Sequence, residues 1–169
     1  MSDPVTNTAT AAAIFGKEAV AAALADHAAI VGLSPFIIDA KWDRNELTLT
    51  VVPEKIVDAC KAAQSSGYNF FEDCTCVDWF PTEPRFQVTY HLLSHKLKQR
   101  LRLIARVHGD TPTIPSITSV WPAANFYERE VFDLFGVRFE GHPRLTRIMM
   151  PDNWNGHPLR KDYPVEGYR

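Results

Sequence analysis

Cysteine is scarce in this chain, with three among 169 residues, at positions 60, 74 and 76. Three thiols cannot form a disulfide framework, which excludes the small disulfide-stapled secreted domains and favours a reducing compartment. The N-terminus also lacks the basic start and apolar run of a signal peptide. No stretch of about 18 uncharged apolar residues is present to cross a membrane. We therefore expect a cytoplasmic protein.

Strong net charge is missing as well: the formal net charge is −2, so no overall field attracts nucleic acid. No glycine-rich loop of the kind that holds a dinucleotide or a phosphate occurs, and three cysteines are too few for an iron–sulfur cluster ligated by this chain alone. The chain is instead rich in apolar residues. Hydrophobic residues make up 46% and aromatic residues 11%, which suits the core of a single domain.

The hydrophobic periodicity predicts an α+β fold, with helices packed on one β-sheet. Helical spacing favours a helix over 13–32, ended by Gly32, and a second over 53–67, started by Pro53. Alternating apolar residues predict strands over 35–40, 46–52, 68–80, 85–93 and 100–108. The last two strands are expected to form a hairpin, and the order is α-β-β-α-β-β-β. A further helix over 122–135 should end at Gly136.

The domain boundaries follow from composition. Residues 1–12 are polar and expected to be frayed, and residues 13–136 are expected to form the α+β domain. Residues 137–169 hold four prolines and three glycines, and their large apolar residues keep no steady period. A segment this apolar and this irregular predicts an extended arm that becomes ordered against a partner protein.

The predicted arm contains Gly-His-Pro twice, at 141–143 and 156–158. A residue before proline is pushed out of the α region, so His142 and His157 cannot form the helical His-x-x-x-His metal site. We expect sharp corners in which the two imidazoles bind backbone groups. A metal site formed by both histidines with Asp152 and Asp162 is the alternative.

Three further groups of residues each allow a structural and a functional interpretation. Cys74 and Cys76 share one face of a strand and are expected to pack in the core, with metal ligation as the alternative. A basic series at even positions predicts either a solvated sheet face or a dock for an acidic partner: Lys96, Lys98, Arg100, Arg102 and Arg106. Carboxylates of the helix over 122–135 suit ion pairs at a surface or interface, with acid–base chemistry as the alternative: Glu128, Glu130 and Asp133.

The stretch "SITSVWPAANFYEREVFDLFGVRFEGHPRLTRIMMPDNWNGHPLRKDYP", residues 116–164, closely resembles the signature region of the 30-kDa-type subunit of respiratory complex I. In bacteria this is the C subunit of NADH:quinone oxidoreductase. The motifs "ERE", "DLFG", "GHP" and "GHPLRKDYP" follow one another in a single register. Upstream, "CTCVDWF", "RFQVTYHLLS" and "RLRLIARV" are similar to the sheet of that family, so the resemblance covers residues 30–164.

The resemblance implies an α+β fold with a mixed β-sheet and helices packed on it. It also implies a non-catalytic structural and assembly subunit in the peripheral arm of the proton-translocating enzyme, where it supports electron transfer from NADH to quinone. The chain would count as an enzyme only as part of this translocase. The resemblance implies no catalytic, cofactor-binding or metal-binding residue in this chain, with FMN and iron–sulfur clusters in partner subunits. The expected place is the cytoplasmic side of the cell inner membrane, held peripherally by the complex.

The implied partners are other peripheral-arm subunits, above all the quinone-site subunit and the iron–sulfur subunits. Residues expected at this interface lie on the helix over 122–135 and on the arm: Glu128, Arg129, Glu130, Asp133, His142, Arg147, His157, Arg160, Lys161 and Asp162. Two alternatives stay open. The chain would play the same role in a related complex of the plastoquinone or membrane-bound hydrogenase type, or it would be a stand-alone metal-dependent enzyme using His142 and His157.

Overall fold

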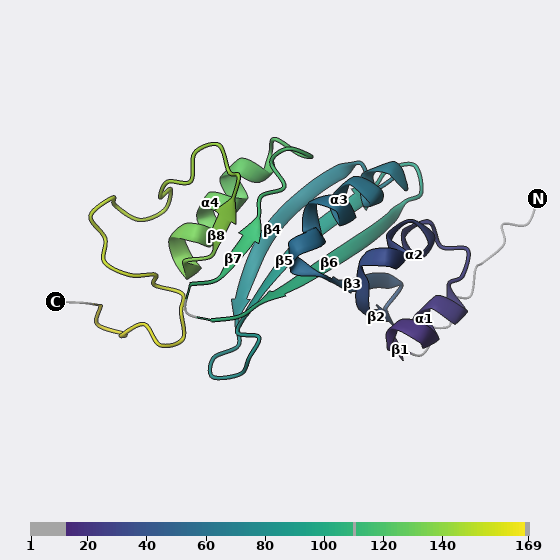
Figure 1. Ribbon diagram of the computed structural model, residues 1–169, viewed down its shortest axis with the longest axis horizontal. Coiled ribbons are helices and arrows are strands. Elements are labelled where there is room, and N and C mark those ends of the chain that lie inside the picture. The colour runs from purple at the N-terminus through teal and green to yellow at the C-terminus, as the bar shows by residue number, and fades with distance from the viewer. Residues whose placement is uncertain (1–12, 110, 168–169) are drawn as a thin grey trace, which may run out of the picture.

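The computed structural model describes residues 13–109 and 111–167, and the expectation of a frayed N-terminus over residues 1–12 lies outside them. The chain folds around a six-stranded sheet in the order β1-β2-β3-β6-β5-β4 (Figure 1). The strands are β1 (Ile14–Phe15), β2 (Ile37–Asp43), β3 (Glu46–Val51), β4 (Phe70–Asp78), β5 (Phe86–Ser94) and β6 (Gln99–Val107). β3 and β6 run parallel and the other neighbours antiparallel, which confirms the predicted mixed sheet of an α+β fold.

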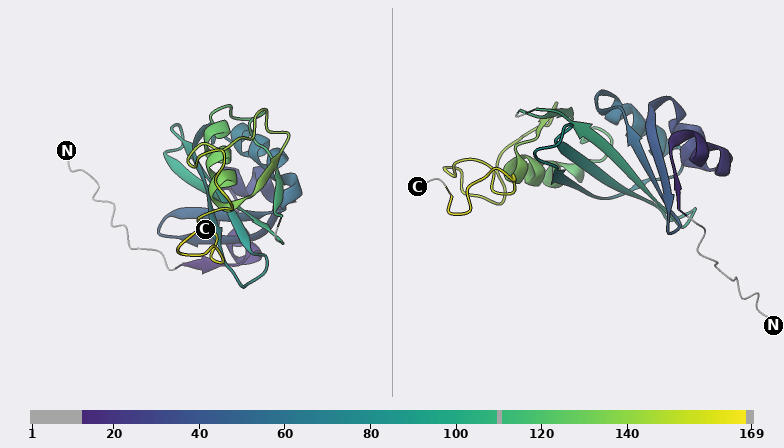
Figure 2. Two further views of the ribbon diagram at one scale, coloured as in Figure 1. Left: turned by 90° about the vertical axis from the view of Figure 1, so that its left-hand side faces the viewer. Right: turned by 90° about the horizontal axis from the view of Figure 1, so that it is seen from below.

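The alternation of apolar residues places one face of the sheet in the core. On β6, Leu101, Leu103 and Ala105 are buried, and on β5 the same holds for Val88 and Leu92. Successive side chains of a strand point to opposite faces, so the spacing that predicted the strands also decides which face is buried. Helix α3 (Ile56–Ser65) covers this face after the short 3₁₀ helix η2 (Pro53–Lys55) and contributes a buried stripe to the core (Figures 1 and 2).

The N-terminal region differs from the single helix predicted over 13–32. It contains two short helices, α1 (Lys17–Ala23) and α2 (Ala28–Leu33), followed by the 3₁₀ helix η1 (Ser34–Phe36). The break lies before α2, where the side chain of His27 accepts a hydrogen bond from Ala29 N as an N-cap. Gly32 lies inside α2 rather than at its end. A Cβ at this position would come within 2.0 Å of Ser66 Oγ, so the glycine permits close packing of α2 against the end of α3.

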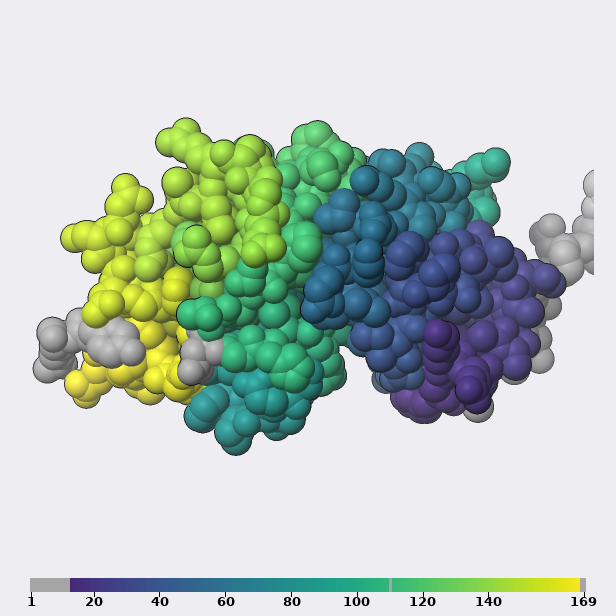
Figure 3. Space-filling view, in the orientation of Figure 1, coloured from purple at the N-terminus to yellow at the C-terminus, as the bar shows by residue number. Residues whose placement is uncertain are grey.

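Helix α4 (Ala124–Phe135) lies beside β4 at one edge of the sheet and ends at Gly136, which adopts a left-handed conformation with φ of 77°, as predicted for its cap. Two short strands, β7 (Thr113–Pro115) and β8 (Arg138–Glu140), pair in parallel next to it. Since β8 pairs with β7, regular structure continues past the predicted boundary at residue 136. The irregular C-terminal arm, residues 141–167, lies against the rest of the chain at one end of the molecule (Figure 3).

Candidate partner-binding site on helix α4 and the C-terminal arm

The carboxylate of Asp133 on α4 holds the first part of the arm. Its Oδ2 accepts hydrogen bonds from the backbone N–H groups of Ile148, Met149 and Met150, at 2.9, 2.8 and 2.8 Å. Its Oδ1 accepts from Arg147 Nη1. Asp133 is fully buried, and burial by itself raises the pKa of a carboxyl, but these four donors hold the pKa of Asp133 below its usual value. Asp133 and its four donors thus form a first clamp, in which a buried, ionised carboxylate holds the arm.

The arm also caps the C-terminal end of α4. The last carbonyl groups of a helix find no partner within it, yet here every one of them accepts a hydrogen bond from a residue that follows the helix. The pairs are Gly136 N to Phe132 O (2.8 Å), His157 Nδ1 to Asp133 O (2.9 Å), Leu159 N to Leu134 O (3.0 Å) and Arg160 Nε to Phe135 O (2.6 Å). The guanidinium is also attracted by the negative end of the helix dipole.

Both Gly-His-Pro corners bind backbone groups, as predicted. His142 Nδ1 accepts a hydrogen bond from Arg144 N at 3.0 Å, so its Nε2 carries the proton that it donates to Asn125 O on α4 at 3.2 Å. His157 donates to the last turn of α4. Burial lowers the pKa of both imidazoles. In the part of the chain that the structure describes, no group of three or more His, Cys, Asp or Glu side chains is placed to hold a metal ion.

A second clamp holds the far part of the arm, through two residues that the sequence did not point to. Arg85, just before β5, is buried and binds Asp78 at the end of β4 with Nε at 2.9 Å and Nη2 at 2.8 Å. The same guanidinium binds Asp162 of the arm at 3.0 and 2.6 Å, and Lys161 N donates to Asp78. Burial raises the pKa of Asp78, but these hydrogen bonds outweigh it and lower the pKa to about 2.

Glu128 on α4 is fully buried and holds the loop that precedes the helix. Its two carboxyl oxygens accept from Ser116 Oγ at 2.6 Å and from Ile117 N at 2.7 Å. Burial raises the pKa of Glu128 to about 7, against the opposing effect of these two donors. The nearest imidazole nitrogen, His142 Nε2, lies 4.0 Å from it. Because this pair has no access to solvent, it suits a structural role better than acid–base chemistry.

The structure therefore assigns most of the predicted interface residues to bonds within the chain. Glu128 and Asp133 are buried, and Arg129 donates to the backbone carbonyls of Thr146 and Arg147. Both carboxylates are fully bonded inside the protein, so their expected contact with a partner has no support in this structure and stays a prediction. The arm is bonded to its own domain through the two clamps, and the expectation that it becomes ordered against a partner stays a prediction.

Part of the predicted set nevertheless stays at the surface. Glu130 on α4 and Lys161 on the arm are exposed, and neither side chain forms a hydrogen bond or ion pair with the described residues. Two large apolar side chains are exposed on the same elements, Phe126 by 62% and Met149 by 61%. Exposed apolar residues beside an unpaired charge are typical of a protein interaction surface. These four side chains form the candidate partner-binding surface.

The three cysteines lie in the core between α3 and β4, as the packing interpretation predicted. Cys60, Cys74 and Cys76 are all buried and free. Burial raises the pKa of each thiol, that of Cys76 to about 12 and that of Cys74 well above its usual range. The protonated thiol behaves as a small apolar side chain and is a poor nucleophile or metal ligand.

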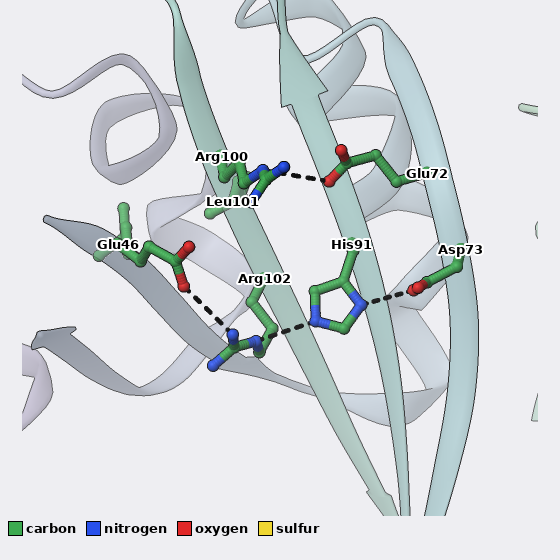
Figure 4. Close-up of a pocket in the computed structure, with 8 residues that line it drawn as sticks. Glu46, Glu72, Asp73, His91, Arg100, Leu101 and Arg102 are labelled. Atoms are coloured by element: carbon green, nitrogen blue, oxygen red, sulfur yellow. Dashed lines mark hydrogen bonds and ion pairs between the residues drawn. The ribbon is translucent and has the colours of Figure 1, made fainter. Parts of the chain in front are cut away.

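The basic series divides into a paired and an unpaired part. A row of polar contacts crosses four strands of the open sheet face: Glu46 Oε2 lies 3.2 Å from Arg102 Nη2, Arg102 Nε donates to His91 Nε2 at 3.0 Å, and His91 Nδ1 binds Asp73 (Figure 4). Arg100 lies 3.7 Å from Glu72. These acids pair with Arg100 and Arg102 within the chain, which favours a solvated sheet face over a basic dock along β6. Arg106 lies over the ring of Trp79 at 5.9 Å. Lys96 and Lys98 instead lie in the exposed turn before β6.

Residues 49–169 match the family described as "Respiratory-chain NADH dehydrogenase, 30 Kd subunit". The chain is 44% identical over 151 residues to the C subunit of NADH-quinone oxidoreductase from Roseiflexus sp. (strain RS-1), covering 88% of this chain and 82% of the relative. It is 50% identical over 133 residues to the protein of the same name from Geobacter sulfurreducens, covering 78% and 82% of the two chains. The family match includes the residues of α4, the arm and both clamps.

Two solved structures are similar as well. One is described as Nqo5, a trypsin-resistant fragment (1-134), with 34% identity, a TM-score of 0.55 and coverage of 59% of this chain and 83% of that one. The other belongs to the membrane-bound sulfane sulfur reductase, an archaeal respiratory membrane complex. It has 30% identity and a TM-score of 0.72 and covers 80% of this chain and 82% of that one.

We expect Gly136→Val to loosen the arm from α4. The residue has a φ of 77°, which a β-branched side chain resists, and a Cβ there would come within 2.6 Å of both Arg160 Nη2 and His157 Cδ2. The predicted loss in free energy of unfolding is about 2–4 kcal/mol, measured by urea denaturation. Gly141→Val is the matched control, because Gly141 has a φ of 78° and nothing within 4 Å. Equal losses in the two variants would contradict the proposed contact with the arm.

We expect the buried Glu128 to make stability depend on pH. Its pKa rises from 4.5 to about 7 on folding, so the folded chain keeps a proton that the unfolded chain releases. The resulting stabilisation is fully present below pH 4.5 and is lost as pH rises through 7, by about 3 kcal/mol in total. Glu128→Gln keeps a neutral hydrogen-bonding group and should lack this loss.

The measurement is urea denaturation of both proteins between about pH 4.5 and 8. Subtracting one curve from the other removes the contributions that they share, among them that of His157. The variant should gain stability relative to the parent as pH rises. A difference that stays constant with pH would show that Glu128 is ionised throughout this range.

Proposed function

This chain belongs to the family of the 30-kDa subunit of respiratory-chain NADH dehydrogenase, and we propose that it serves as the C subunit of an NADH-quinone oxidoreductase. The observation that carries the proposal is the identity of 44–50% with proteins of that name over about four fifths of both chains. Its role is that of a structural and assembly subunit in the peripheral arm, where it supports electron transfer from NADH to quinone.

The chemistry of the chain supports a role without an active site of its own. The groups that could act as nucleophile, acid or metal ligand are already used for structure: the thiols are protonated in the core, Glu128 binds Ser116, and both arm histidines bind backbone carbonyls. We therefore propose that partner subunits bind FMN and the iron–sulfur clusters.

The location that we propose is the cytoplasmic side of the cell inner membrane, where the complex holds the chain peripherally. The relatives that are named for NADH-quinone oxidoreductase support this placement, since quinones are dissolved in the membrane. None of the helices within residues 13–109 and 111–167 is long and apolar enough to cross a membrane.

The partners that we propose are other peripheral-arm subunits, above all the quinone-site and iron–sulfur subunits. The candidate partner-binding surface supports this, because Phe126 and Glu130 lie one helical turn apart on α4 and stay free while the other charges of the helix are bonded inside. The clamps give this surface a fixed shape before any partner arrives. Pre-ordering lowers the entropy cost of association.

A second candidate is the same role in a related membrane complex. The similarity to a chain of the archaeal sulfane sulfur reductase complex, over 80% of this protein, favours it. Affinity purification of the tagged chain from its own cells, followed by mass spectrometry of the subunits bound to it, separates the two. A flavin-containing NADH-oxidising subunit among them supports the NADH-quinone oxidoreductase, and its absence beside other complex subunits supports the related complex.

We expect the purified chain, expressed without other subunits, to show no visible absorption band and to oxidise no NADH. The physical reason is that this chain supplies neither a glycine-rich nucleotide loop nor enough thiolate ligands for a cluster. Spectrophotometry of untagged protein at high concentration is the measurement. A stoichiometric flavin or iron–sulfur band would overturn the proposal of a cofactor-free subunit.

We expect Glu130→Ala to leave the isolated fold unchanged and to weaken incorporation into the complex by about three- to tenfold. The side chain is exposed and forms no bond within the described chain, so its removal costs little stability. Thermal unfolding and the amount of co-purified partner subunits are measured together. Glu18→Ala is the control, an exposed helical glutamate on α1, which packs against β2 near the other edge of the sheet. Normal incorporation of the Glu130 variant would contradict this prediction and show that Glu130 is only a solvated charge.

A further inference from the structure

Two hairpin turns meet at one end of the sheet. The turn between β2 and β3 contains Arg44 and Asn45, and the turn between β5 and β6 contains residues 95–98. Because β3 and β6 are parallel neighbours, both turns lead into the same end of the sheet. A pocket of about 410 Å³ lies between them, and its lining includes His27, Trp42, Arg44, Lys98 and Arg100.

Three cations at these turns have no acid to neutralise them. Arg44, Lys96 and Lys98 are exposed, and in the described part of the chain none of them forms an ion pair. The acids nearby are already occupied, since Asp43 binds Lys41 at 2.9 Å and Glu46 binds Arg102 at 3.2 Å. The turns therefore present net positive charge on a chain whose formal net charge is −2.

The backbone of the two turns gives a second, independent observation. Arg44, Asn45 and Lys98 have φ angles of 50°, 63° and 53°, and they are the non-glycine residues with positive φ among those described. All three line the same pocket. Glycine and asparagine adopt this left-handed region readily, whereas arginine and lysine do so at a cost in free energy. Cationic side chains are thus kept at positions where glycine would be less strained, which points to a use for their charge.

We propose that these two turns bind a short acidic segment of a neighbouring subunit, with a carboxylate of that segment seated between Arg44 and Lys98. This inference rests on the proposed function, because the partner is taken to be another subunit of the complex. Anionic bilayers are bound by clusters of about four to eight Lys and Arg residues, and nucleic acids by many phosphate contacts. Three unpaired cations, with Glu46 and Asp43 close by, fit a few protein carboxylates.

The first test is charge reversal in the tagged chain, with co-purified subunits quantified by mass spectrometry at about 50, 150 and 500 mM salt. Arg44→Glu with Lys98→Glu should retain about tenfold less partner at low salt, and the difference from the parent should shrink as salt rises. Lys55→Glu with Lys61→Glu is the control, because these exposed residues on η2 and α3 give the same change in net charge. The control should retain partners to within about twofold of the parent.

A second variant separates docking from folding. Arg44→Gly with Lys98→Gly removes the charges and relieves the left-handed strain, so the isolated chain should be at least as stable as the parent. It should still lose partner affinity. A variant that binds as the parent does would overturn the proposal, whatever its stability.

Zero-length carbodiimide cross-linking then identifies the occupant. Lys96 and Lys98 in the intact complex should form amide bonds to Asp or Glu residues of one partner subunit, with loss of water. Replacing both lysines by arginine should keep assembly and abolish these cross-links. If the parent chain joins the complex but Lys96 and Lys98 stay unlinked and charge reversal matches the control, the acidic dock is wrong while the proposed function stands. If the parent chain joins no complex, the proposed function itself fails.

Discussion

The buried carboxylate of Asp133 is the constraint on which the C-terminal third of the structure depends. An ionised carboxylate out of contact with water is costly unless its oxygens are fully bonded, and here three backbone N–H groups and Arg147 bond them. The same arginine continues to the carbonyls of Trp154 and Gly156, at 3.0 Å each. Helix and arm are therefore stable only together: the arm needs the carboxylate as acceptor, and the carboxylate needs the arm as donor.

Arg85 gives the arm its second fixed point and joins it to the sheet. It bridges Asp78 on β4 and Asp162, which are 84 residues apart in sequence, and Arg160 lies over the ring of Phe86 at 5.1 Å. With the helix cap between the two clamps, a segment without regular structure is bonded along its length. The apolar side chains that remain outside, such as Met149, are then presented in fixed positions. This is how an irregular segment can form a defined surface without a period of its own.

The sequence was sufficient for elements whose pattern is local. Strands β5 and β6 follow from strict alternation, and the end of α4 follows from a glycine that tolerates positive φ. The sequence was not sufficient to predict which acidic side chains of α4 are buried and which are exposed. Glu130 and Asp133 are three residues apart and share a face, yet one is exposed and the other buried, because the arm crosses the helix over Asp133 and leaves Glu130 open. The path of the arm has no periodic signature, and Arg85 lies in a loop, so neither clamp was predictable from spacing.

Internal neutralisation decides which charges are left for other molecules. The acids of β3 and β4 neutralise basic residues of β6, Asp133 is paired with Arg147, and Arg85 is shared by two aspartates. Within the described chain, Glu130 on α4 stays exposed without an ion pair, and so do Lys161 on the arm and Arg44, Lys96 and Lys98 on the two turns. α4 borders β4, whereas Arg44 follows β2 near the other edge of the sheet, so Glu130 and Arg44 are separated across its width. Like charges repel, so a partner that approached these two places in reverse would meet charges of its own sign at both, and charges separated in this way favour one orientation of binding over the other.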